Sequence, residues 1–362
     1  MIIYNSMILW VTMLGMIYSI IHRNDRKYVN VSWIWGILTF SYIIFWVGIR
    51  SGVADTAAYI AGFEDCPKNL GAIAGAFTSK SKAPGFIMLQ IIFKTVISDN
   101  YHAWLMTIAV LSGIPVMINL KKNSCNFFYS SFLFIVMLHV TWMLNGIRQF
   151  IVAAILFGLS DWILKRKTIP FLLMVLLLST IHYTVLIMIP VYFIVTEKPF
   201  SKKINLFCIA LLICVVFINP FVSSLENMLS STAYAGYTLQ FADDDGVNPI
   251  RVLVMLVPPV LAFIGRRRLR QLNNAYINIC INMSIITAGL YFLGMFTSGV
   301  LIGRLPIYFE LYNLILLPYL IEECFLPDSA RITYCFATIG YGIFYYLQMR
   351  GSYYISELTG LL

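Results

Sequence analysis

Apolar stretches separated by short polar segments follow one another along the whole chain. Many of them approach the roughly 20 residues that an α-helix needs to cross the ~30 Å hydrocarbon core of a bilayer. The first, residues 2–21, has no basic leading segment and no small-residue cleavage site. This favours a retained membrane span over a signal peptide. The pattern predicts an all-α, polytopic integral membrane protein.

Lysines and arginines gather in short clusters between the apolar stretches. The clusters lie at residues 23–27, 121–122, 165–167, 198–203 and 266–270. Short basic loops mark the cytoplasmic side of a membrane protein. These clusters therefore set the orientation of the spans, and without a soluble basic domain the net charge of +9 does not indicate nucleic-acid binding.

With the basic clusters inside, the other segments can be assigned to the two sides of the membrane. External loops are expected at about 51–83 and 224–249. Residues 168–196 lie between two basic clusters, so they must go out and return as two short segments. The threading gives about 12 transmembrane helices in a single transmembrane domain, residues 1–362.

One apolar stretch, residues 84–98, conflicts with this threading. It is only about 15 residues long and it carries Lys94. If it crossed the membrane, Lys121 and Lys122 would fall outside, against the positive-inside rule. We therefore expect residues 84–98 to be re-entrant or interfacial, or else part of residues 66–80 to dip into the membrane.

The composition excludes a water-soluble core. Hydrophobic residues make up 60% of the chain and charged residues 11%, whereas soluble domains average about 45–50% and about 25%. The seven cysteines form no CxxC pair, and the four histidines have no ligand spacing among them. We therefore predict no metal site and no cofactor.

The outer end of the second predicted span carries a polar group. Arg50 ends this span, and Asp55 and Tyr59 follow it. A guanidinium has the planar shape that binds phosphate oxygens, although an arginine at a helix end can also serve as a simple interfacial anchor. Asp55 is a candidate catalytic base or the partner of this arginine.

A second polar group is expected at the outer tip of a hairpin. Asn145, Arg148 and Gln149 are spaced i, i+3 and i+4, which predicts that they share one helical face. His182 lies where the two short segments of residues 168–196 meet, and it is either a structural histidine or a second candidate base.

A third group lies near the end of the chain. Arg304, Tyr308 and Tyr312 are spaced i, i+4 and i+8, which suits a lipid headgroup or a sugar but also an ordinary interfacial aromatic belt. Ion-coupled transport usually needs acidic residues within the spans. Here Glu310 is the main one, so the three groups fit a diphosphate-linked, membrane-held substrate better than ion conduction.

Three segments that contain these positions resemble the EpsG family, which is related to the Wzy-type polysaccharide polymerases. FWVGIRSGVADTAAYIAGFED, residues 45–65, is similar to the opening motif of the family. Residues 145–194 run from an N-x-x-R-Q tip through a basic turn to a histidine, as the central block of the family does. GRLPIYFELYNLILLP, residues 303–318, resembles its late span with arginine and tyrosine. In order and spacing the resemblance covers nearly the whole chain.

Two positions depart from the family pattern. The family usually has glycine-threonine-aspartate after the first arginine, where this chain has Val53, Ala54 and Asp55. After the histidine a serine is common, where this chain has Tyr183 and Thr184.

The resemblance implies a fold like that of the GT-C membrane glycosyltransferases and a function in the assembly of O-antigen, capsule or exopolysaccharide. It implies transfer of a growing glycan from undecaprenyl diphosphate to the incoming repeat unit in an inverting, metal-independent reaction. The diphosphate-linked substrate would be bound by Arg50, Tyr59, Asn145, Arg148, Gln149, Arg304 and Tyr308, with His182 or Asp55 as the base. The expected location is the bacterial inner membrane with the site facing the periplasm, and the expected partners are membrane lipids and a chain-length regulator protein.

Other membrane functions remain open at this point. A flippase for lipid-linked oligosaccharide would need a polar path through both leaflets, whereas the polar groups here gather outside. Another GT-C glycosyltransferase could use Glu64 and Asp65 as its acidic pair, although they follow the second span by some 14 residues. An O-antigen ligase would usually have a larger external loop than 224–249.

Overall fold

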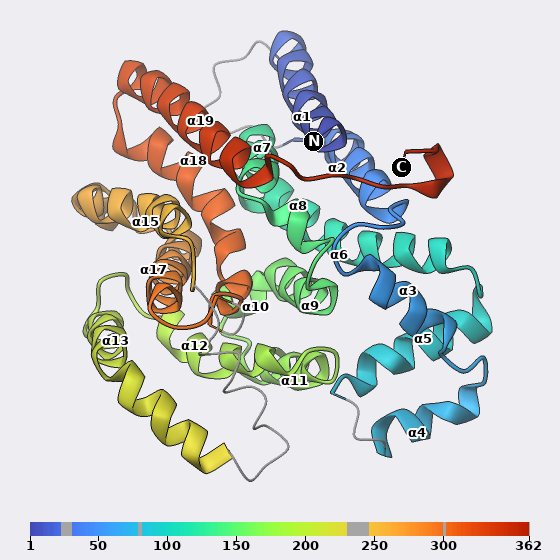
Figure 1. Cartoon of the computed structure of the whole chain (residues 1–362). Coiled ribbons are helices and arrows are strands. Elements are labelled where there is room, and N and C mark those ends of the chain that lie inside the picture. The colour runs from blue at the N-terminus through green and yellow to red at the C-terminus, as the bar shows by residue number, and fades with distance from the viewer. Residues whose placement is uncertain (23–30, 79–81, 230–245, 300–301, 362) are drawn as a thin grey trace. The chain divides into compact units, whose positions relative to one another are not determined.

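The computed structural model is built almost entirely of helices (Figure 1). It describes residues 1–22, 31–78, 82–229, 246–299 and 302–361. Helices account for 78% of the structure, and no strand occurs among the described residues. One isolated β-bridge in the described part of the chain pairs Ser356 with Leu361. The predicted all-α class is confirmed. The chain separates into two compact units, residues 1–189 with 328–362, and residues 190–327, and each is described by itself.

The first unit contains most of the helices. They are α1 (Ile2–Ile21), α2 (Trp33–Gly48), α3 (Thr56–Glu64), η1 (Leu70–Ala72), α4 (Ile73–Thr78), α5 (Pro84–Val96), α6 (Tyr101–Asn123), α7 (Phe127–Val136), α8 (His139–Trp142), α9 (Ile147–Gly158), α10 (Ser160–Leu164), α11 (Thr168–Ser179), η2 (Tyr183–Ile187), α19 (Pro327–Met349) and η5 (Glu357–Thr359).

The helices α2 and α6 of this unit pack against each other in opposite directions. At one end, the Lys121 amine lies 4.5 Å from the centre of the Trp33 ring. At the other end, Met106 packs so closely that a Cβ on Gly48 would lie 2.5 Å from its sulfur. A third helix, α9, packs against α6, and the ends of the two helices meet where the Asn119 amide donates to the Phe157 carbonyl at 2.6 Å.

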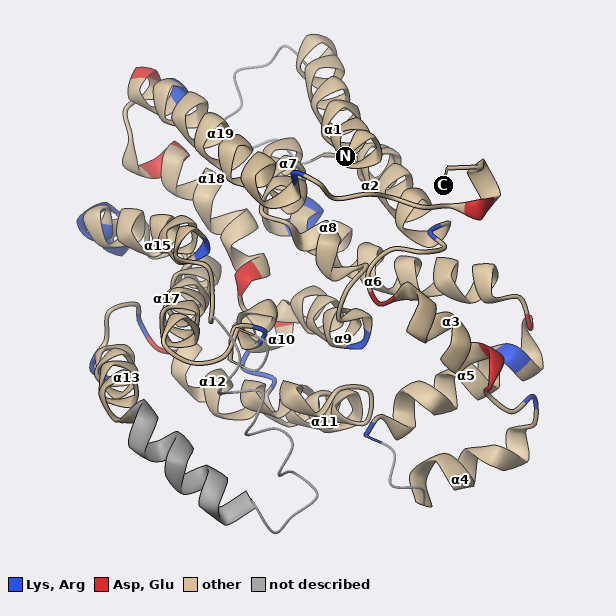
Figure 2. Cartoon of the chain, in the orientation of Figure 1, with Lys and Arg blue, Asp and Glu red and all other residues tan. Residues whose placement is uncertain are grey.

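The two ends of the first unit differ in chemistry. At the basic end, Asp161 pairs with Lys122, and it lies 3.4 Å from the Lys165 amine. The opposite end, here called the tail end, is formed by the end of α2, the start of α6 and the chain tail, residues 350–361. There the Ser356 hydroxyl donates to the Ile49 carbonyl at 2.6 Å, and the Tyr101 hydroxyl donates to Glu357 at 2.9 Å. Figure 2 shows the helices of the first unit tan, without charged residues, along most of their length.

The antiparallel packing of α2 and α6 bears on residues 84–98. Because α2 ends and α6 begins at the tail end, the chain between them must leave and return at that end. The helix α5 has 13 residues, about 20 Å, which is short of a full crossing. Its Lys94 amine donates to the carbonyls of Phe63 and Cys66 at 3.0 and 2.9 Å. These contacts support a re-entrant or interfacial α5. The expected external loop 51–83 is itself partly helical, because it contains α3, η1 and α4.

The second unit holds the remaining helices. They are most of α12 (Met188–Val195), α13 (Lys202–Leu229), α15 (Pro249–Ile264), α16 (Arg266–Leu272), α17 (Ala275–Met295), η3 (Leu305–Tyr308), η4 (Glu310–Tyr312) and α18 (Asn313–Cys324). The helix α17 packs against α13, α15 and α18. The one acid noted within a predicted span, Glu310, is buried and accepts a hydrogen bond from the Tyr291 hydroxyl at 2.6 Å. Since α13 extends to Leu229, the expected loop 224–249 begins later, and its residues 230–245 lie outside the described residues.

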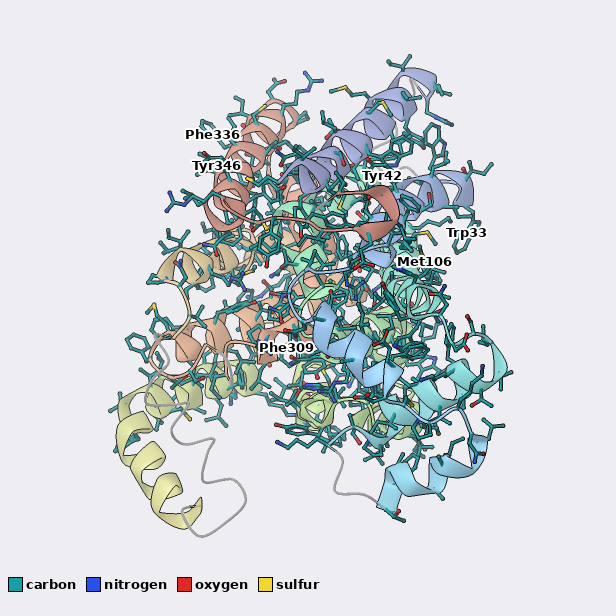
Figure 3. The ribbon with its side chains drawn as sticks, turned by 45° about the vertical axis from the view of Figure 1, so that its right-hand side comes forward. Trp33, Tyr42, Met106, Phe309, Phe336 and Tyr346 are labelled. Carbon is teal, nitrogen blue, oxygen red and sulfur yellow. The ribbon has the colours of Figure 1, made fainter. Side chains whose placement is uncertain are left out.

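Few of the described helices are long enough to cross a membrane alone. By length and apolar composition, α1, α6 and α17 qualify, and α15 with α16 makes a fourth if this pair, bent by 69°, is one span. A further set of apolar helices, among them α2, α5, α7, α9 and α11, has only 10–17 residues each. The predicted 12 or so crossings stay a prediction. Large apolar side chains on the outside, such as Phe336 and Tyr346 of α19, are 72% and 60% exposed (Figure 3) and suit contact with lipid.

Candidate functional site

The hairpin tip between α8 and α9 is held by a carboxylate from another part of the first unit. Gly146 adopts φ +70°, a left-handed conformation that glycine reaches without steric cost, and it caps the start of α9. Its amide donates to Asp55 Oδ2 at 3.0 Å. A carboxylate at a helix N-terminus is favoured by the helix dipole. Asp55, which starts α3, therefore ties this helix to the tip of the hairpin.

Arg50 is completely buried just after the end of α2. Its Nε donates to the Thr56 hydroxyl at 3.0 Å, and its Nη1 donates to the Val47 carbonyl. Its Nη2 is buried with no partner among the described residues. Burial lowers the pKa of Arg50 to about 10, which leaves the guanidinium charged at neutral pH. No ion pair between Arg50 and Asp55 occurs in the described part of the chain, so this arginine is a candidate site for an anion.

Arg148 occupies the first turn of α9, next to the capped tip. Its guanidinium carbon lies 5.9 Å from the centre of the Phe86 ring, a cation–π distance. The same ring meets Tyr59 of α3 edge to face at 5.8 Å. The Nε of Arg148 and the Oδ1 of Asn145 are buried without a partner among the residues described. Polar atoms in this condition are costly unless something binds them.

His182 lies where α11 ends and η2 begins, as the sequence predicts. Its Nδ1 is 2.8 Å from the Thr184 hydroxyl, which also accepts a hydrogen bond from the Gln149 amide at 3.5 Å. The ring stacks on Tyr183 at 5.7 Å. Thr184 thus joins the histidine to the first turns of α9.

The start of α5 packs against the end of α11 within the same region. The Gly85 amide donates to the Thr180 carbonyl at 2.9 Å. A Cβ on Gly85 would lie only 2.1 Å from the Thr180 hydroxyl, so no larger residue fits there without movement. This contact sets the place of Phe86, which follows Gly85 and faces Arg148.

These contacts bring together most of the residues that the sequence proposes. Those in the first unit form one connected group at the tail end, here called the arginine site: Arg50, Asp55, Tyr59, Asn145, Arg148, Gln149 and His182, with Phe86 and Thr184. The predicted shared helical face of Asn145, Arg148 and Gln149 is wrong. The helix α9 starts only at Ile147, because Gly146 turns the chain into the left-handed region, so Asn145 lies before the helix.

The predicted face of Arg304, Tyr308 and Tyr312 is also wrong. The chain forms two short 3-10 turns, η3 and η4, before α18 begins at Asn313. Pro306 in the first turn lacks an amide hydrogen, and 3-10 geometry aligns residues three apart rather than four. Tyr308 and Tyr312 are buried, and Arg304 belongs to the second unit. Roles for Arg304 and Tyr308 in the substrate site stay predictions.

The sequence does not point to several residues that complete the arginine site. Thr56 and Thr184 orient Arg50 and His182, and Phe86 supports Arg148. A signal existed for Thr184, which lies two positions after the histidine, and for Phe86, which follows a Pro-Gly helix start. Nothing in the local pattern marks Ser356 of the tail, which bonds to the Ile49 carbonyl next to Arg50.

The described residues contain no group of three or more His, Cys, Asp or Glu side chains that could hold a metal ion. Glu64 and Asp65 lie exposed at the opposite end of α3 from Asp55.

Comparison with known proteins gives one match. The model of the EpsG family matches residues 32–358, which is most of the chain. No curated protein and no solved structure matches the chain.

Proposed function

Because the chain belongs to the EpsG family, whose members are Wzy-type polymerase-like, we propose that it polymerises lipid-linked oligosaccharide repeat units. In this proposal it transfers the growing glycan from undecaprenyl diphosphate to the incoming repeat unit at the outer face of the membrane. The product would be a surface polysaccharide such as O-antigen (the glycan of lipopolysaccharide), a capsule or an exopolysaccharide.

The observation that carries the proposal is the pair of arginines in the arginine site. Arg50 and Arg148 each have a buried nitrogen without a partner among the described residues, and no carboxylate neutralises Arg50 there. Fixed guanidinium groups bind phosphate oxygens well. In the reaction they hold the diphosphate and stabilise the negative charge that develops as it leaves.

The transfer is a single displacement. The acceptor hydroxyl oxygen attacks the anomeric carbon, the bond from that carbon to the diphosphate oxygen breaks, and undecaprenyl diphosphate leaves with the electron pair. A base takes the hydroxyl proton. Of the two candidates we assign this role to His182, with Thr184 orienting its ring through Nδ1, because Asp55 already accepts the Gly146 amide. Asp55 then positions the hairpin tip.

The distribution of charge supports the proposed orientation. The basic end of the first unit would face the cytoplasm by the positive-inside rule, and the tail end with the arginine site would then lie outside the inner membrane of a bacterium. Donor and acceptor would reach the site from the outer leaflet. A chain-length regulator protein is the expected protein partner.

Two other functions are less well supported. A flippase would need polar groups along the whole path through the membrane, whereas the candidate residues of the first unit gather at its tail end. A GT-C glycosyltransferase with Glu64 and Asp65 as its acidic pair would place its chemistry at the far end of α3 from Asp55, away from the buried arginines.

One experiment separates these functions. Purified protein is incubated with undecaprenyl-diphosphate repeat units, and the products are separated as a ladder. Chain extension without another enzyme, with the anomeric configuration of the donor inverted in the new linkage, is the expected result. Movement of the substrate between leaflets without extension would reject the polymerase.

A further inference from the structure

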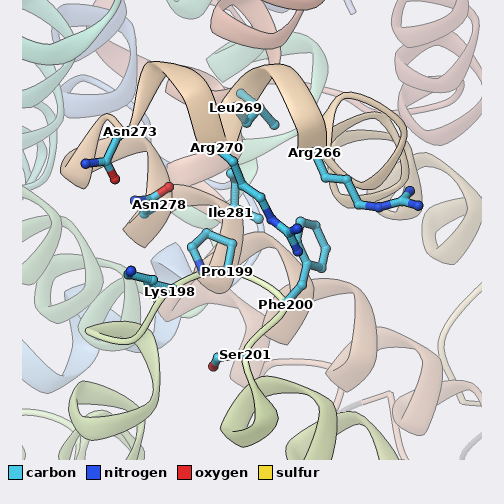
Figure 4. Close-up of a pocket in the computed structure, with 10 residues that line it drawn as sticks. All are labelled: Lys198, Pro199, Phe200, Ser201, Arg266, Leu269, Arg270, Asn273, Asn278 and Ile281. Atoms are coloured by element: carbon cyan, nitrogen blue, oxygen red, sulfur yellow. The ribbon is translucent and has the colours of Figure 1, made fainter.

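A basic cavity in the second unit is separate from the arginine site. It has a volume of about 460 Å³ and lies between the loop that joins α12 to α13 and the helices α16 and α17 (Figure 4). The loop contributes Lys198, Pro199, Phe200 and Ser201, α16 contributes Arg266, Leu269 and Arg270, and Asn273, Asn278 and Ile281 complete the lining.

The cavity is lined by positively charged side chains and by hydrogen-bond donors. None of its described lining residues carries a carboxylate. Figure 4 shows Arg270 extending toward Pro199 and Phe200, with Lys198 on the other side of Pro199. The Ser201 hydroxyl is buried with no partner among the described residues. The cations of Lys198 and Arg270, together with this hydroxyl, suit phosphate oxygens, whereas Arg266 lies over the Phe263 ring.

The loop side of the cavity is fixed in place. The Asn282 amide of α17 donates to the carbonyls of Val195 and Glu197 at 3.0 and 2.8 Å, which anchors the chain just before Lys198. The Phe200 and Phe263 rings meet at 5.5 Å, and the Arg266 guanidinium lies over Phe263 at 4.2 Å. These contacts hold the loop side of the cavity in place within the second unit.

Apolar surface next to the cavity indicates that the anion is attached to a lipid. Phe263 and Ile264, at the end of α15, are 50% and 70% exposed, and Leu206 on α13 is 66% exposed. These side chains would lie against acyl chains, while the cavity sits where the apolar helices give way to the basic clusters. A soluble phosphate would gain nothing from them.

We propose that this cavity binds the phosphate headgroup of an anionic phospholipid from the leaflet that faces the basic clusters, which by the positive-inside rule is the cytoplasmic one. Lys198 and Arg270 contact the phosphate, and the Ser201 hydroxyl donates to it. The exposed apolar side chains of α13 and α15 contact the acyl chains. The site does not depend on the proposed polymerase reaction.

The test measures lipid binding to the full chain in detergent by native mass spectrometry. Phosphatidylglycerol is compared with phosphatidylcholine of the same acyl chains. The double variant K198Q/R270Q removes both proposed phosphate contacts, and K202Q/R267Q removes the same charge from the same segments at residues that do not line the cavity. We expect K198Q/R270Q to lose about 30-fold in affinity for phosphatidylglycerol and the control to change less than about threefold.

Two further measurements test the proposal even if a double variant folds poorly. The charge-conserving variant K198R/R270K should keep the preference for phosphatidylglycerol. An equal loss in both double variants would overturn the proposal, because the general surface charge would then explain the binding. Displacement of bound phosphatidylglycerol by inorganic phosphate would also overturn it, since the cavity would then take a soluble anion.

Discussion

Arg50 and Arg148 meet the cost of a buried charge in different ways. Arg50 is held by the Thr56 hydroxyl and the Val47 carbonyl, both neutral acceptors, so its charge is solvated without being neutralised. Arg148 lies against the face of Phe86. A cation in either setting keeps its attraction for an incoming anion, whereas a partner carboxylate would compete with the substrate for it.

Replacing Arg148 tests whether the arginine site binds the leaving group. Arg148→Ala should lower the rate of chain extension about 100-fold or more, the usual loss when one group that stabilises developing charge is removed. Arg148→Lys should recover part of this, because it restores the charge without the planar shape. The rate is read from the product ladder at equal amounts of protein in the membrane.

Arg331 provides the matched control. Its side chain is 84% exposed, and it lies 3.9 Å from Asp328 at the start of α19. Arg331→Ala removes the same charge from the same unit and should leave the ladder unchanged. Full activity in Arg148→Ala would exclude this arginine from the site.

His182 and Asp55 can be distinguished by replacing each with an amide side chain. His182→Gln removes the proposed base, so the rate should fall about 100-fold or more. Asp55→Asn keeps an oxygen that can accept the hydrogen bond from the Gly146 amide. If Asp55 only positions the hairpin tip, the rate should therefore fall less than about tenfold.

At the scale of elements, the arginine site depends on how α5 meets α11. Gly85 has no side chain where a Cβ would lie 2.1 Å from the Thr180 hydroxyl and 3.1 Å from its carbonyl carbon. Backbone on one side of the contact cannot move aside cheaply. The helix α5 therefore carries Phe86 to Arg148 only while residue 85 is glycine.

Gly85→Ala should destabilise the protein by about 1–3 kcal/mol through overpacking, with a lower midpoint of thermal unfolding and a weaker product ladder. Gly62→Ala is the control, because Gly62 lies within α3 and a Cβ there would meet nothing within 4 Å. That change should be neutral or slightly stabilising, since alanine favours helix. Equal behaviour of the two variants would show that the α5–α11 contact is not tight in solution.

The sequence predicts the elements of the first unit better than their breaks. Apolar length and basic clusters correctly place the two short segments around His182 and favour a re-entrant α5. The break between α7 and α8 occurs at Leu138, which adopts φ +70°. Leucine rarely adopts this left-handed conformation. Only tertiary contacts can fix such a position, so the pattern predicts an unbroken span there.

The candidate site shows the same division. Arg50, Arg148 and His182 stand out because polar groups next to apolar spans are costly. The contacts that bring these segments together join distant parts of the chain: Gly146, whose amide donates to Asp55, lies 91 positions from it, and Ser356 donates to the Ile49 carbonyl across 307 positions. Spacing along one helix cannot reveal such pairs, and the two helical faces that it predicted are both interrupted by a change in backbone geometry.

At the scale of the whole molecule, the proposed function requires the arginine site and the basic clusters to face opposite sides of the membrane. The first unit has this polarity in its own packing. Lys165 lies at the basic end beside Asp161, whereas Lys68 pairs with Asp99 just before α6 begins at the tail end.

Cysteine labelling tests this orientation directly. With the exposed Cys214 and Cys335 replaced by serine, Lys68→Cys should react with a membrane-impermeant maleimide in spheroplasts, whose inner membrane is sealed but exposed. Lys165→Cys should react only after that membrane is permeabilised. The two side chains are 56% and 60% exposed, so unequal labelling reflects the membrane and not burial in the protein. Labelling of Lys165→Cys before permeabilisation, with Lys68→Cys protected, would put the arginine site in the cytoplasm, where periplasmic polymerisation of lipid-linked repeat units could not use it.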